Sequence, residues 1–168
     1  MNIFLNNLKI QLSNIDVSKL ETFKKLVLNS KGTILILGNG GSNAIASHIA
    51  EDYTKVLKKP AISFSDAARL TCYSNDYGYE NAFKEFLKEF SDKHSLIILI
   101  SSSGNSTNIL KCAEYCKDNN IKFVILSGFN KENKLQTFSK ESELNFWVDS
   151  TDYGVVECIH EIILHSII

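Results

Sequence analysis

The chain of 168 residues contains little proline, little arginine and no long apolar run. Its one proline and eight glycines form no linker-like stretch, so we expect a single domain over residues 1–168. No apolar run approaches the roughly 18 residues that a membrane-spanning helix needs, and we expect no membrane partner. The N-terminus lacks the charged leader and apolar block of a signal peptide, which predicts a cytoplasmic location.

A predominance of one charge sign is also missing. The 18 basic and 19 acidic residues give a formal net charge of -1, which provides no bulk attraction to nucleic acid or to a membrane surface. Arg69 is the one arginine, so lysine is the main cation of the chain. The four cysteines have no C-x-x-C spacing, which argues against zinc-knuckle and redox motifs. We expect them to be small buried residues in a reducing compartment: Cys72, Cys112, Cys116 and Cys158.

Short aliphatic runs alternate with segments of helical periodicity. Such runs are typical of strands buried on both faces of a parallel sheet, and they occur at 33–37, 61–64, 96–100, 122–126 and 144–148. Helices are expected at 43–57, 80–90, 107–117 and 153–167, with two more in residues 1–30. The pattern predicts a three-layer αβα sandwich over residues 32–168, with a central five-stranded parallel sheet and preceding N-terminal helices.

Two of the expected strands end in turns that suit an anion. Gly38-Asn39-Gly40-Gly41-Ser42 opens a helix, where glycines allow close backbone approach and the helix start offers free N–H groups. It lacks the Lys-Ser/Thr ending of a P-loop and the glycine spacing of a dinucleotide fingerprint. Ser101-Ser102-Ser103-Gly104-Asn105-Ser106 adds several hydroxyl donors. Taken singly, these segments also fit a tight structural turn and a serine-rich cap. Together they predict a phosphate site at the carboxyl ends of the strands.

Three motifs occur in an order that resembles a known family. They are G-N-G-G-S followed by His48, N-D-Y-G-Y-E at 75–80 and S-S-S-G-N-S at 101–106. The chain resembles the sugar isomerase (SIS) domain, which has a flavodoxin-like fold, and within it the phosphoheptose isomerases, over about residues 32–165. The resemblance implies a sugar-phosphate substrate in contact with Asn39, Gly40, Gly41, Ser42, Asn75, Asp76, Ser101, Ser102, Ser103 and Ser106. On its residues alone, the segment 74–78 also fits a polar turn.

The resemblance further implies a zinc site on two helices, with His48, Asp52, Glu157 and His165 as ligands. The implied catalytic residues are Asp52, Glu157 and His165. Two positions depart from the family's pattern, because Asp52 replaces a glutamate and Glu157 replaces a glutamine. Two carboxylates and two imidazoles are still an acceptable zinc set. We hypothesise that Glu157 has become the catalytic base while Asp52 holds the metal, with Glu51 as a fallback ligand.

The activity that the resemblance implies is the conversion of sedoheptulose 7-phosphate to D-glycero-D-manno-heptose 7-phosphate through an enediol. This reaction would serve heptose biosynthesis for lipopolysaccharide or capsule. A carboxylate would remove the proton α to the carbonyl, and His165 would carry a proton between the oxygens. The alternative is a non-catalytic SIS protein that binds a sugar phosphate or a partner protein, in which case the altered carboxylates mark the loss of catalysis. The family also implies a homotetramer, with a dimer as the alternative. His160 is expected to be structural or to lie at an interface.

Overall fold

The computed structural model describes residues 2–168, so residue 1 of the expected N-terminal segment lies outside the described residues. Five parallel strands form one sheet in the order β2-β1-β3-β4-β5. Their bounds are β1 (Ile34–Leu37), β2 (Ala61–Ser63), β3 (Leu96–Ser101), β4 (Lys122–Ser127) and β5 (Leu144–Trp147). This order is the flavodoxin-like one, and the predicted five-stranded parallel sheet is confirmed.

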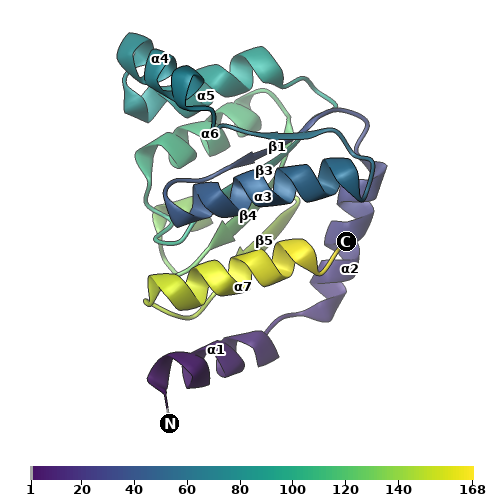
Figure 1. Ribbon diagram of the computed structural model, residues 1–168, viewed down its shortest axis with the longest axis vertical. Helices are drawn as coiled ribbons and strands as arrows, with labels where there is room; N and C mark the ends of the chain where they lie inside the picture. The colour runs from purple at the N-terminus through teal and green to yellow at the C-terminus, as the bar shows by residue number, and fades with distance from the viewer. Residues whose placement is uncertain (1) are drawn as a thin grey trace.

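Helices cover both faces of the sheet, as Figure 1 shows. One face carries α3 (Gly41–Lys55) and α7 (Tyr153–His165), with α2 (Val17–Asn29) packed beside them. The other face carries α4 (Ala67–Tyr77), α5 (Tyr79–Phe90) and α6 (Thr107–Asp118). The first helix, α1 (Ile3–Ser13), packs on the outer side of α7. The three-layer prediction is confirmed.

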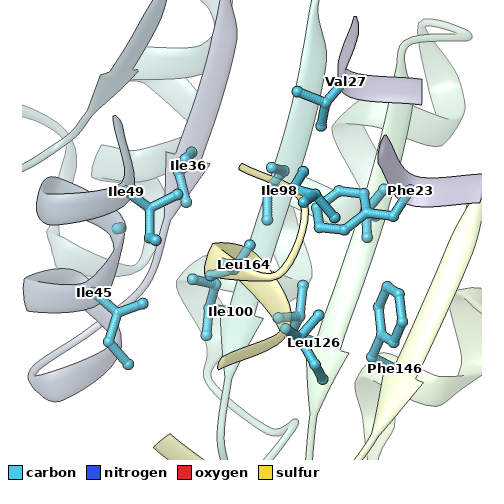
Figure 2. Close-up of a cluster of buried hydrophobic side chains, with 14 of the residues drawn as sticks. Phe23, Val27, Ile36, Ile45, Ile49, Ile98, Ile100, Leu126, Phe146 and Leu164 are labelled. Carbon is cyan, nitrogen blue, oxygen red and sulfur yellow. The ribbon is translucent and has the colours of Figure 1, made fainter. Parts of the chain in front are cut away.

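Alternate residues of the strands supply two separate cores. Ile34 and Ile36 of β1 face the side of α3 and α7, whereas Leu35 and Leu37 face the side of α5 and α6. Figure 2 shows sheet residues Ile98 and Leu126 together with α3, α7 and α2 residues that close over them. Because every one of these side chains is buried, α3 and α7 are held beside each other on the same face of the sheet.

Three expectations about local structure were wrong or incomplete. The helix α4 was not expected, although Asp66 caps it by accepting a hydrogen bond from the Arg69 backbone N–H at 2.8 Å. The 3₁₀ helix η1 (Lys134–Phe138) was also not expected. Cys112 and Cys116 are buried in α6 as expected, but Cys158 of α7 is only partly buried, and Cys72 is exposed because it lies on α4, which has no buried residue. Within residues 2–168, no helix is both long and apolar enough to cross a membrane.

Candidate functional site

The glycine turn (38–42) and the serine turn (101–106), which were predicted to bind a phosphate, line one cavity of about 310 Å³. They meet because β1 and β3 pair as neighbours, so their carboxyl ends lie side by side. Eight of the ten predicted substrate contacts line this cavity: Asn39, Gly40, Gly41, Ser42, Ser101, Ser102, Ser103 and Ser106. The cavity is also lined by Glu157, which the sequence analysis proposed as the catalytic base, and by Ile100 and Tyr153, which were not predicted.

The cavity presents hydrogen-bond donors without positive charge. Helices α3 and α6 begin here, and neither has a side-chain hydrogen bond at its N-cap, whereas α1, α2, α4 and α7 do. Their first N–H groups are therefore available to an anion. The Ser102 Oγ is buried and has no hydrogen-bond partner within residues 2–168. Gly40 has φ of 54°, which a residue with a side chain rarely adopts, so glycine permits the turn into α3.

Helix α7 brings a carboxyl group into the same cavity. Glu157 lies against the start of α3, where a Cβ placed on Gly41 would be only 2.6 Å from the Glu157 carboxyl carbon. Glycine at position 41 therefore makes room for this carboxyl group. Burial raises the pKa of Glu157 above its ordinary value. The result is a partly buried carboxyl group with increased basicity, facing the glycine and serine turns.

A hydrogen-bonded clamp holds the first turn to the helix that follows the second. Asn39 Nδ2 donates to Asn108 Oδ1 at 2.9 Å, and Asn108 Nδ2 donates to Asn39 Oδ1 at 2.8 Å. The Tyr79 hydroxyl also donates to Asn39 Oδ1, at 2.7 Å. Asn108 is buried in the first turn of α6. Sequence reasoning missed Asn108 and Tyr79 because they lie far from Asn39 along the chain.

A second group of functional side chains lies between α3 and the end of α7. Asp52 Oδ2 is 3.4 Å from His48 Nε2 and 3.3 Å from His165 Nε2. Glu161, which was not predicted, places its Oε1 3.4 Å from His48 Nδ1. Glu157 does not belong to this group, since its carboxyl group lies at the Gly41 end of α3. The structure thus brings together three of the four predicted zinc ligands, and the fallback ligand Glu51 is also outside the group.

These three side chains fit a metal ion. Two imidazole nitrogens and a carboxylate oxygen lie within 4.8 Å of one another, and all are accepted zinc donors. His165 Nδ1 lies 3.1 Å from the Glu161 carbonyl oxygen, which can only accept, so Nδ1 carries the proton and Nε2 has a free lone pair. The His48 side chain is 55% exposed, which leaves the group open to a substrate oxygen.

The remaining two predicted substrate contacts lie elsewhere. Asn75 and Asp76 are exposed in the last turn of α4, where Asn75 Nδ2 donates to Asp76 Oδ1 at 3.0 Å. They do not line the cavity within the described chain. The polar-turn alternative is wrong for these two residues, because the helix continues to Tyr77.

Comparisons with known proteins point to one family. The SIS domain family model matches residues 10–128. The chain is 37% identical to the phosphoheptose isomerase of Fusobacterium nucleatum over 80% of this chain and 70% of the relative. It is 33% identical to the enzyme of that name from Sodalis glossinidius, over 90% and 76% of the two chains. The solved phosphoheptose isomerase of Neisseria gonorrhoeae superposes with a TM-score of 0.87 at 25% identity, covering 95% of this chain and 88% of the other.

Proposed function

Because this chain belongs to the SIS domain family, and within it to the phosphoheptose isomerases, we propose that it isomerises sedoheptulose 7-phosphate to D-glycero-D-manno-heptose 7-phosphate. The observation that carries the proposal is the cavity in which both anion-binding turns face Glu157. The product would enter heptose biosynthesis for lipopolysaccharide or capsule.

We place the phosphate at the serine turn and the start of α6. Both neutral hydroxyl donors and uncapped N–H groups converge there. The start of α3 is less suitable for the phosphate, because the Glu157 carboxyl group already lies against Gly41. Neutral donors also allow the product to leave after each turnover, since they hold a phosphate less tightly than paired cations do.

The sugar chain would then extend from the phosphate along α3 towards His48. Seven residues separate Gly41 from His48, which is about 10 Å along a helix. Side chains on a helix lean towards its N-terminus, so His48 and Asp52 lean back towards the cavity. An elongated sugar phosphate can therefore contact the serine turn and the histidine group at the same time.

We assign the base to Glu157 and the metal-holding role to His48, Asp52 and His165. The raised pKa of Glu157 favours proton abstraction from the carbon α to the carbonyl. Because His165 Nδ1 is held by a carbonyl, Nε2 would give its lone pair to the metal, and we assign His165 to metal binding rather than to proton transfer. A zinc ion bound by the three side chains would supply Lewis-acid polarisation of the substrate oxygens.

The test compares Glu157→Gln and Asp52→Asn in an assay with sedoheptulose 7-phosphate and in zinc content measured by plasma mass spectrometry. We expect Glu157→Gln to lower kcat at least 100-fold with zinc content unchanged, and Asp52→Asn to lose zinc. Glu51→Gln is the matched control, because this exposed carboxylate on α3 lies outside the group. Full activity in Glu157→Gln would refute the assignment of the base. Sugar-phosphate binding with no turnover in the unaltered protein would favour the non-catalytic alternative.

We also propose a homo-oligomer, a tetramer as the first expectation and a dimer as the second. The support is the apolar surface of the N-terminal segment, where Ile3 is 85% exposed and Val17 is 67% exposed. Tyr153, at the cavity, is 58% exposed as well, so a neighbouring copy could complete the site. Light scattering coupled to size-exclusion chromatography measures the state, and a monomer at micromolar concentration would exclude both. The four free thiols support a reducing, cytoplasmic location.

A further inference from the structure

A second cavity lies at the amino ends of the parallel strands, opposite the end that carries the glycine and serine turns. Its volume is about 400 Å³, and it is lined by the C-terminal half of α2, the loop before β1, and the starts of β3 and β4. Figure 1 shows α2 at the end of the molecule where α3 and α7 finish, which is the amino end of the parallel strands. The six residues of β3 separate the second cavity, at the start of the strand, from the serine turn at its end by about 20 Å. The two cavities are therefore distinct.

The lining of this cavity is strongly basic. It contains four lysines from four different segments: Lys25, Lys31, Lys93 and Lys122. All four are exposed, and none forms an ion pair with a carboxylate within residues 2–168. No aspartate or glutamate is among the lining residues. In a chain whose net charge is -1, four uncompensated cations around one cavity are a local concentration of positive potential.

The cavity also has an apolar part. Leu26 of α2 and Leu96 of β3 are lining residues, and both are at least partly buried. The volume lies in the range of small-molecule sites, which combine an apolar lining with a few polar or charged groups. Lysine binds phosphate groups as a mobile point charge, and several lysines together favour a ligand with more than one negative charge.

We propose that this cavity binds a polyphosphate anion, with the polyphosphate of a nucleotide as its source. The lysines would neutralise the phosphates while Leu26, which is partly exposed, contacts the ribose or base. The site is separate from the catalytic cavity, so the proposal does not depend on the isomerase activity.

The test is an amide NMR titration of the ¹⁵N-labelled full-length chain with ATP, with pyrophosphate and with adenosine, all without divalent metal. Gly32 and Ser95 report on the basic cavity, because they lie beside it at the starts of β1 and β3. Gly41 and Ser102 report on the catalytic cavity. The test variant is Lys93→Ser/Lys122→Ser, and the control is Lys55→Ser/Lys140→Ser. The control removes the same charge from exposed positions outside the cavity.

We expect ATP and pyrophosphate to shift Gly32 and Ser95 saturably, ATP with the lower Kd, and adenosine to leave them unshifted. The test variant should weaken ATP binding at this cavity about tenfold, since each exposed ion pair contributes up to about 1 kcal/mol, and the control should change it less than about twofold. Shifts confined to Gly41 and Ser102, shifts that do not saturate, or equal weakening in the two variants would overturn the site. Equal affinity for pyrophosphate and ATP would overturn the nucleotide as the source.

Discussion

His160, in the buried part of α7, offers a quantitative test of how the free energy of unfolding depends on pH. This side chain is fully buried, and its Nε2 donates to the Ser127 carbonyl oxygen at 3.1 Å. Its Nδ1 has no hydrogen-bond partner within residues 2–168. Burial lowers the pKa of His160 from 6.5 to about 4, so the imidazole stays neutral in the folded protein at every pH above about 4.

The sign of the effect follows from proton binding in the two states. Below pH 6.5 the unfolded chain takes up a proton at His160, whereas the folded chain takes one up only near pH 4. The contribution to stability is therefore complete above pH 6.5 and is lost as the pH falls towards 4. Between pH 7 and pH 5, linkage gives a loss of about 2 kcal/mol in the free energy of unfolding.

Urea unfolding of the unaltered protein and of His160→Gln at pH 7 and pH 5 measures this loss. The glutamine amide can still donate to the Ser127 carbonyl but does not titrate. All other groups titrate alike in both proteins and cancel in the comparison. Protein concentration is held fixed, because assembly would contribute to stability. We expect the unaltered protein to lose about 2 kcal/mol more than the variant. Parallel losses within about 0.5 kcal/mol would refute the reasoning.

Three further predictions concern the proposed catalytic cavity, which is lined by the glycine and serine turns and Glu157. Glu157→Gln should raise the unfolding midpoint at pH 7 more than at pH 4, because a pKa raised by burial means that ionisation costs stability as pH rises; a calorimetric scan showing equal shifts would contradict this. Gly41→Ala should cut kcat about 100-fold by displacing the Glu157 carboxyl group, with helix content by circular dichroism retained; unimpaired turnover would count against the contact. Asn108→Ala should raise KM for the sugar phosphate more than it lowers kcat, because Asn39 loses its clamp at a cost of about 1–3 kcal/mol; an unchanged KM would show that the clamp does not position Asn39.

Local patterns in the sequence were sufficient for most of the fold. The aliphatic runs such as 96–100 predict strands buried on both faces, and their alternation with helical segments predicts parallel neighbours. Helix α4 has no fully buried residue, and only Leu70 and Tyr73 pack partly against the core, so its apolar pattern is weaker than that of the other helices. Its cap at Asp66 and the spacing of Leu70 and Tyr73 are the local features that could have located it.

The candidate site was also predictable only in part from the sequence. The glycine and serine turns were predicted from the sequence to lie together, and they do line one cavity, because parallel strands present their carboxyl ends at the same end of the sheet. That this cavity binds an anion stays a prediction. The direction in which the Glu157 carboxyl group points could not be predicted from the local sequence. Whether Glu157 turns towards Gly41 or towards His165 depends on how α7 is rotated against α3, and that rotation is set by buried contacts between helices and sheet. Helical spacing places Asp52 beside His48, whereas tertiary packing decided that His165 also reaches Asp52 and that Glu157 enters the cavity.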